Sequence, residues 1–106
     1  VYLIDGRPSP WPAMLSLDAD SIASFVGETT TDPIGISLAG LGDIDGDGVG
    51  DFAIGAPGTQ GSVFVISGRT GPWGNELVAR TVASTVIEGT GLPVSDFGRS
   101  LAGGRD

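Results

Sequence analysis

Apolar and polar positions divide this chain into short apolar segments separated by turns rich in glycine, proline and aspartate. The run Val63–Ile66 is apolar at consecutive positions, which is typical of a strand covered on both faces. Only residues 13–20 indicate a helical turn. We expect strands at 1–5, 22–28, 62–67, 82–88 and 97–102, and a hairpin within 34–57. The pattern therefore predicts an all-β fold with many turns.

The chain repeats itself, which favours a fold built from similar units. The segment VYLIDGR at 1–7 recurs as VFVISGR at 63–69, an offset of 62 residues. Residues 34–40 recur at 97–103, an offset of 63. We also match residues 21–24 to 81–84, an offset of 60. The period is therefore 60 to 63 residues, with small length changes in the connections.

An acidic loop, DIDGDGVGD, lies between two apolar runs of the hairpin. Its four carboxylates would repel one another at close range, and Ca²⁺ prefers several oxygen ligands in a flexible cage. The intervening glycines allow the backbone to fold tightly enough for the carboxylates to converge. We expect a Ca²⁺ site with water in the remaining positions. Its predicted ligands are the side chains of Asp43, Asp45, Asp47 and Asp51 and the carbonyl of Val49.

Two other interpretations of the loop are weaker. An EF-hand begins similarly but needs a bidentate Glu at position 12 and flanking helices. Position 12 is Ile54, and the flanks are glycine-rich and typical of strands. A solvated acidic turn is the plainer alternative, since Asp and Gly are common turn formers. Four aspartates and three glycines in this order favour the metal site.

The loop and its flanks resemble an FG-GAP repeat. The resemblance covers Ile34–Gly40, the loop, and Gly55–Pro57, with Ile34 where the family usually has Phe. The later copy, FGRSLAG at 97–103, has the Phe. Such repeats form the β-propeller of integrin α subunits and of many bacterial surface proteins, and their loop binds Ca²⁺ between two strands of a blade. The resemblance thus implies a bacterial-like or integrin-like surface protein.

The resemblance also implies β-propeller blades, here a partial propeller of about 1.7 repeats. Residues 1–33 would end one blade, 34–89 would form one full blade with the calcium loop, and 90–106 would begin the next. So few strands cannot close a ring, so we expect further blades from the same polypeptide or from neighbouring copies as a homo-oligomer. The alternative is a small independent sandwich.

Composition narrows the function classes. The net charge of −8, from 13 acidic residues and five arginines, opposes binding to nucleic acid or anionic membranes. There is no Cys and no His, so thiol chemistry and a Ser-His-Asp arrangement are absent. No apolar run is long enough to span a bilayer. Four of the acidic residues cluster in one loop, which a calcium ion would occupy. We therefore predict that the chain is not an enzyme.

The function that the resemblance implies is a calcium-stabilised module for extracellular protein binding, adhesion or assembly. We place it at the cell surface or in secreted material, because weak calcium sites fill where free calcium is high. Two alternatives stay open. One is a non-catalytic propeller segment of a larger secreted enzyme, and the other is a structural subunit of a surface layer or filament.

Two tryptophans recur with the repeat. Trp11 and Trp73 follow Arg7 and Arg69 at the same distance. An exposed aromatic residue could contact a partner, but recurrence once per repeat favours a packing role. We expect both tryptophans, and the arginines including Arg99, to be structural.

Overall fold

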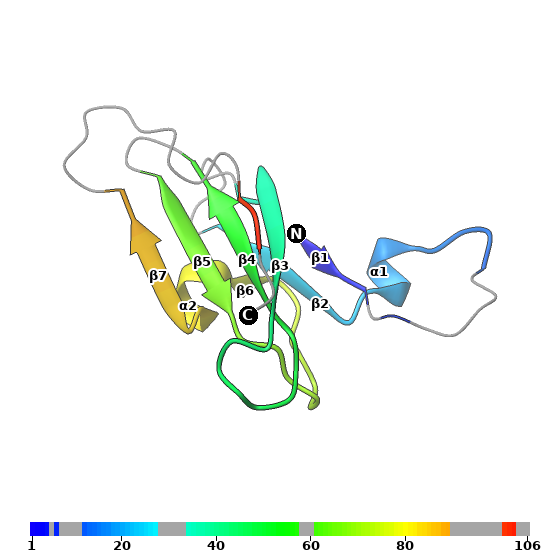
Figure 1. Ribbon diagram of the computed structural model, residues 1–106. Coiled ribbons are helices and arrows are strands. Elements are labelled where there is room, and N and C mark those ends of the chain that lie inside the picture. The colour runs from blue at the N-terminus through cyan, green and yellow to red at the C-terminus, as the bar shows by residue number, and fades with distance from the viewer. Residues whose placement is uncertain (5, 7–11, 28–33, 58–60, 90–100, 104–106) are drawn as a thin grey trace.

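The computed structural model describes residues 1–4, 6, 12–27, 34–57, 61–89 and 101–103 (Figure 1). Two sheets and two short helical turns make up this part of the chain. The elements in chain order are β1 (Tyr2–Leu3), α1 (Leu17–Asp20), β2 (Ala23–Val26), β3 (Ser37–Gly42), β4 (Asp51–Ala56), β5 (Ser62–Ile66), β6 (Leu77–Val78), α2 (Ala79–Val82) and β7 (Thr85–Glu88). The prediction of an all-β fold is confirmed.

The larger sheet is a four-stranded antiparallel meander in the order β3-β4-β5-β7. The β3–β4 hairpin pairs Ser37 with Gly55 and closes at the pair Gly42–Asp51, with a register shift between Gly40 and Gly42. The next hairpin pairs Ile54 with Phe64. Four antiparallel strands in one sheet are the unit from which propeller blades are built.

The smaller sheet has the order β1-β2-β6. Strands β1 and β2 are antiparallel, with Tyr2 opposite Ser24. Strand β6 pairs with β2 in parallel, with Phe25 opposite Leu77. The chain segment that leads from β5 toward β7 thus contributes a strand to the other sheet, which links the two sheets.

The hydrophobic core lies between the sheets. Ile54 and Ile66 of the larger sheet are fully buried, and Phe25 of the smaller sheet is 1% exposed. The Phe25 ring meets the ring of Phe52 edge-on at 5.7 Å and the ring of Trp73 edge-on at 5.8 Å. Burial of each large apolar side chain contributes about 1.5–3 kcal/mol. The core cluster consists of Ala23, Phe25, Ile54, Ala56, Phe64, Ile66 and Ala79.

The apolar run of β5 behaves largely as its sequence predicts. Val63 and Phe64, whose side chains point to opposite faces of the strand, are 5% and 3% exposed. Ile66 is fully buried, and Val65 is half-buried. The strand is therefore covered on both faces.

The offset of 60 residues that matched 21–24 to 81–84 is wrong. Tyr2 and Phe64 are equivalent at an offset of 62, and their strand partners are Ser24 and Val86, which also differ by 62. The two helical turns, Leu17–Asp20 and Ala79–Val82, differ by 62 as well. The offset between these strand pairs and helical turns is therefore constant at 62 residues in the structure.

The strand predicted at 82–88 begins only at Thr85, because Val82 is still part of α2. The side chain of Arg80 in α2 pairs with Glu88 and places its guanidinium 5.3 Å from the centre of the Phe64 ring. Ala79 is completely buried beneath this turn. The short apolar run in this segment is compatible with either a strand or a helical turn. The contacts of Arg80 and the burial of Ala79 favour the helical turn. The helical turn expected within 13–20 is confirmed as α1.

The last described residues lie against β3. A Cβ atom built on Gly103 would lie 1.8 Å from the carbonyl oxygen of Gly40, so the two backbones are in direct contact. Gly40 and Gly103 are equivalent positions of successive copies at the offset of 63. Equivalent positions of neighbouring repeats thus lie side by side, as stacked repeat units require.

Candidate metal site in the acidic loop

The loop that joins β3 to β4 holds the predicted ligands. Three glycines around it, Gly42, Gly46 and Gly48, have φ angles of 74°, 80° and 88°. These angles lie in the left-handed region, which side chains with a Cβ rarely adopt. These glycines therefore permit the tight turns of the loop, and three of its aspartate side chains come together.

Three carboxylates converge in the loop. Asp43, Asp45 and Asp51 each offer an oxygen, and these oxygens all lie within 4.8 Å of one another. Asp43 and Asp45 are exposed, whereas Asp51 is 3% exposed. Several carboxylate oxygens at this spacing, on a loop with free access to solvent, match the ligand type that Ca²⁺ takes. The residues present therefore fit a hard divalent cation.

Backbone N–H groups surround the Asp43 carboxylate. Its Oδ1 accepts hydrogen bonds from the N–H groups of Gly46 at 2.8 Å and Asp47 at 3.1 Å, and its Oδ2 accepts one from Gly48 at 2.7 Å. The Gly48 bond, with the other two, lowers the pKa of Asp43 below its ordinary value despite some desolvation. The carboxylate is thus held ionised and fixed in orientation.

The neighbouring carboxylate of Asp45 shows the opposite tendency. The Asp47 N–H donates to it at 3.2 Å and favours the ionised form. Desolvation and the nearby carboxyls of Asp47 and Asp43 outweigh this bond and raise the pKa of Asp45. The crowding of acidic groups that the sequence indicated is therefore present in the structure.

Asp51 anchors the loop to the sheet. Its Oδ2 accepts a hydrogen bond from the Ile44 N–H at 2.9 Å, and its Oδ1 accepts one from the Gly68 N–H at 2.8 Å. One carboxylate thereby connects the start of the loop to the residues that follow β5. The bond from Gly68 is buried, and the bond from Ile44 is partly buried.

Sequence reasoning missed the contribution of Ser67 and Gly68. Ser67 favours the ionised form of the Asp45 carboxyl and so acts to lower its pKa, and Gly68 packs against the loop. A Cβ atom on Gly68 would lie 2.0 Å from the Gly50 carbonyl oxygen. The available signal was the recurrence of Gly-Arg at 6–7 and 68–69, which marked Gly68 as a repeat position but did not show what it contacts.

The predicted ligands do not all converge. Asp43, Asp45 and Asp51 form the group of three, and the Asp47 carboxylate lies outside it. Asp47 instead accepts a hydrogen bond from the Val49 N–H at 2.9 Å through its Oδ1. Val49 is half-buried in the same loop. The geometry thus supports three of the predicted carboxylate ligands, and Asp47 and the Val49 carbonyl stay predictions.

Trp73 has the packing role that its recurrence indicated. It is half-buried against Phe25, and the Arg69 guanidinium lies 4.4 Å from the centre of its ring. Arg69 thus makes a cation–π contact. Trp11, Arg7 and Arg99 lie outside the described residues.

Comparison with known proteins supports the resemblance to FG-GAP repeats. Residues 35–66 match the family model of the FG-GAP repeat. The chain is 44% identical over 73 residues to integrin alpha-7 of Rattus norvegicus, a match that covers 68% of this chain and 6% of the relative. It is 38% identical over 76 residues to integrin alpha-PS2 of Drosophila melanogaster, covering 68% of this chain and 5% of the relative. The chain thus spans a small fraction of these relatives. No solved structure shows significant similarity to it.

Proposed function

We propose that this chain, which carries an FG-GAP repeat at residues 35–66, is a calcium-stabilised part of a β-propeller that binds other proteins. The observation that carries the proposal is the convergence of three carboxylates within the matched repeat. The ligands that we propose are the side chains of Asp43, Asp45, Asp47 and Asp51 and the carbonyl of Val49.

A bound Ca²⁺ would neutralise the repulsion within the loop. The chain's own groups prepare the site, because backbone N–H groups fix Asp43 and the sheet fixes Asp51. Asp45 is exposed and crowded by like charges, so it gains most from a cation. The ion would thereby join the exposed part of the loop to a buried carboxylate of β4.

We further propose that the chain contributes to more than one blade. Residues 34–89 would form one blade, residues 1–33 would end the preceding blade, and residues 90–106 would begin the next. The four-stranded sheet from Ser37 to Glu88 supports the first assignment. The contact between Gly40 and Gly103 supports the third, because it brings equivalent positions of the two copies together.

Protein recognition is the role that this scaffold serves best. Propellers present loops on a rigid frame, and such loops commonly carry binding. The relatives are integrin α subunits, which supports adhesion or assembly as the process and a non-catalytic role for the chain. These relatives are animal proteins, and the bacterial-like surface protein stays a prediction.

The location that we propose is the cell surface or the secreted fraction. Sites of this kind in extracellular modules bind Ca²⁺ with dissociation constants of roughly 10⁻⁴–10⁻³ M, and such sites fill only where free calcium is high. No helix in the described part of the chain is long and apolar enough to cross a membrane. Fractionation of the source cells should place the native protein outside the cytosol, and recovery of the folded protein in the cytosol would contradict this location.

Removal of calcium should lower the melting temperature of the chain. At a Ca²⁺ concentration ten times the dissociation constant, binding stabilises the folded state by about 1.4 kcal/mol. A thermal melt in excess Ca²⁺ should therefore move to lower temperature on addition of a chelator. The replacement Asp45→Ala should abolish most of this shift while changing the melt in chelator little, because Asp45 is exposed.

The matched control for that experiment is Asp20→Ala, which removes an acidic residue outside the loop and leaves the calcium shift intact. Asp20 accepts a hydrogen bond from the Ser16 N–H in an exposed helical turn. If chelator leaves the melt of the unaltered chain unmoved, or if Asp45→Ala shifts as much as the unaltered chain, the assignment of the site fails.

A further inference from the structure

Two peptide bonds of the acidic loop join an aspartate to a glycine, at Asp45–Gly46 and at Asp47–Gly48. Such a pair is chemically labile, because the backbone nitrogen of the glycine lies within reach of the Cγ atom of the aspartate. Glycine has no Cβ atom to hinder this approach. The loop therefore holds two positions at which the chain can modify itself.

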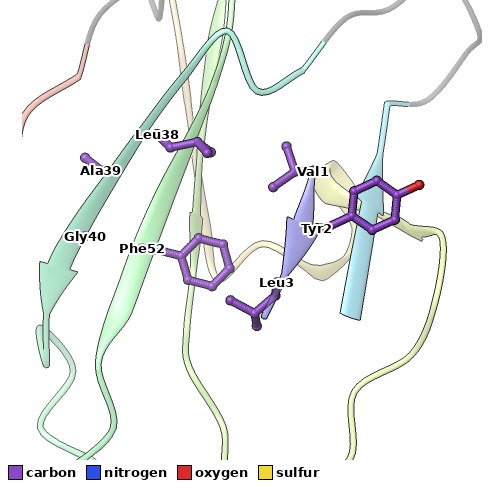
Figure 2. Close-up of a pocket in the computed structure, with 7 residues that line it drawn as sticks. All are labelled: Val1, Tyr2, Leu3, Leu38, Ala39, Gly40 and Phe52. Atoms are coloured by element: carbon purple, nitrogen blue, oxygen red, sulfur yellow. The ribbon is translucent and has the colours of Figure 1, made fainter. Parts of the chain in front are cut away.

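The loop is open to the water that this chemistry requires. Its flanking strands β3 and β4 direct Leu38 and Phe52 into an apolar groove beside β1 (Figure 2), but residues 43–50 do not line that groove. Residues 43–48 are all exposed. Solvent therefore reaches both Asp–Gly pairs.

The reaction proceeds through a succinimide and consumes no reagent. The glycine nitrogen bonds to Cγ, and one carboxylate oxygen leaves as water with the amide proton and a proton from solvent. One water molecule then opens the ring and returns the solvent proton. Cleavage of the new C–N bond restores aspartate, whereas cleavage of the original peptide bond gives isoaspartate. The net change is an isomerisation without oxidation or reduction.

One carboxylate holds both of the nitrogen atoms that would attack. The Gly46 N–H donates to Asp43 Oδ1 at 2.8 Å, and the Gly48 N–H donates to Asp43 Oδ2 at 2.7 Å. Each oxygen of this carboxylate thus accepts the amide of a different Asp–Gly pair. Hydrogen bonds to a charged acceptor are stronger than those between neutral groups. Asp43 therefore restrains both reactive amides at once.

These bonds oppose the reaction directly. A succinimide nitrogen carries no hydrogen, so closure of either ring eliminates one hydrogen bond to Asp43. The nitrogen must also give up its proton beside the Asp43 anion, which disfavours the negative charge that develops. The peptide unit is planar, so a fixed N–H direction restrains the whole unit. Each Asp–Gly pair is therefore less reactive while Asp43 accepts its amide.

The carboxylates that would be attacked have hydrogen bonds of their own. Asp45 Oδ1 accepts the Asp47 N–H at 3.2 Å, and Asp47 Oδ1 accepts the Val49 N–H at 2.9 Å. Both bonds run to the residue two positions further on and pass over the glycine between, as in an Asx turn. Both partners in each reaction are thus restrained.

We infer that Asp43 protects the loop against isoaspartate formation at Asp45 and Asp47. An isoaspartate carries its free carboxylate on Cα and adds one carbon atom to the backbone. Isomerisation at Asp45 would therefore displace one of the three converging carboxylates. The inference concerns the covalent chemistry of the chain and does not rest on bound calcium.

Incubation of the unaltered chain in excess chelator, either folded or unfolded in guanidinium chloride, tests the inference without any substitution. An isoaspartyl methyltransferase with radiolabelled S-adenosylmethionine quantifies isoaspartate in peptides from each sample, and electron-transfer mass spectrometry assigns its position. Formation at Asp45 and Asp47 should be at least about tenfold slower in the folded chain, the factor that corresponds to one hydrogen bond to a charged group. Equal rates in the two states would overturn the inference.

Replacement of Asp43 separates the role of its carboxylate from the rigidity of the loop. In chelator, Asp43→Ala should accelerate formation at Asp45 and Asp47 by about tenfold, toward the unfolded rate. Asp43→Asn keeps one acceptor oxygen, so it should release one glycine amide and accelerate one position more than the other. A third pair, Asp5–Gly6, lies outside the loop and serves as an internal reference whose rate should not change.

The matched control is Ile44→Ala, which alters the exposed neighbour of Asp43 and should isomerise no faster than the unaltered chain. Hydrogen exchange of the Ile44 amide in Asp43→Ala shows whether the rest of the loop stays folded, because this amide donates to Asp51. An unchanged rate in Asp43→Ala, or an equal rise in Ile44→Ala, would overturn the inference.

A loss of Ile44 protection in Asp43→Ala would mean that the whole loop has opened, and Asp43→Asn then decides. Unequal acceleration at Asp45 and Asp47 supports the inference, and equal acceleration contradicts it. Every sample contains chelator, so a calcium titration remains a separate test of the proposed metal site.

Discussion

Replacement of Asp51 by alanine should destabilise the chain by about 1–3 kcal/mol, even without calcium. The buried Asp51 carboxylate accepts hydrogen bonds from the N–H groups of Ile44 and Gly68. A buried donor left without a partner costs about 1–3 kcal/mol, and Asp51→Ala leaves the Gly68 N–H in this state, whereas the Ile44 N–H is only partly buried. Urea unfolding in excess chelator, at fixed protein concentration and followed by tryptophan fluorescence, measures this effect separately from metal binding.

The replacement Asp51→Asn separates hydrogen bonding from charge. The amide keeps one carbonyl oxygen, so it satisfies one of the two N–H donors and should cost less than alanine. Asp45→Ala, which removes an exposed carboxylate, should cost little in chelator. If Asp51→Ala and Asp45→Ala have equal effects in chelator, then Asp51 does not anchor the loop to the sheet as described.

Replacement of Ile54 by alanine should destabilise the chain by about 2–5 kcal/mol. Ile54 is completely buried in β4, opposite Phe64, at the centre of the cluster that joins the two sheets. Loss of its side chain removes buried apolar surface and leaves a cavity that neighbouring strands fill only in part. The same urea unfolding experiment measures the loss.

Ile44→Ala is the matched control for Ile54→Ala. Ile44 has the same side chain but is 59% exposed in the acidic loop, so its replacement should change the free energy of unfolding by no more than about 0.5 kcal/mol. Equal losses for the two variants would show that the core does not lie between the sheets.

The features that sequence predicted well are local ones. The acidic loop and its two flanking strands follow from a few adjacent residues, in which glycines permit the tight turns and aspartates supply the charge. The consecutive apolar positions of β5 likewise predicted a strand covered on both faces. Each of these depends on residues that are close together in the chain.

The features that sequence missed depend on residues that are far apart. Gly68 donates to Asp51 across 17 positions, and nothing in the local sequence of either residue shows this bond. Arg80 of the helical turn at Ala79–Val82 contacts Phe64 and Glu88, and the local sequence shows neither contact. The 60-residue offset failed because similar small residues recur in both copies at positions that are not structurally equivalent.

Asp47 is the predicted carboxylate ligand that lies outside the group of converging carboxylates. Alternation of carboxylates predicted four acidic ligands, of which Asp43, Asp45 and Asp51 offer oxygens that all lie within 4.8 Å of one another. Asp45 and Asp47 each accept a hydrogen bond from the N–H two residues further on, yet only Asp45 belongs to this group. Spacing in the sequence therefore identified the loop but could not rank its ligands.

A calorimetric titration of the chain with Ca²⁺ tests the central claim most directly. We expect saturable binding of one Ca²⁺ per chain, with a dissociation constant of roughly 10⁻⁴–10⁻³ M and loss of binding in Asp45→Ala. A folded chain that binds no Ca²⁺, or one that binds it equally well after Asp45→Ala, would contradict the account.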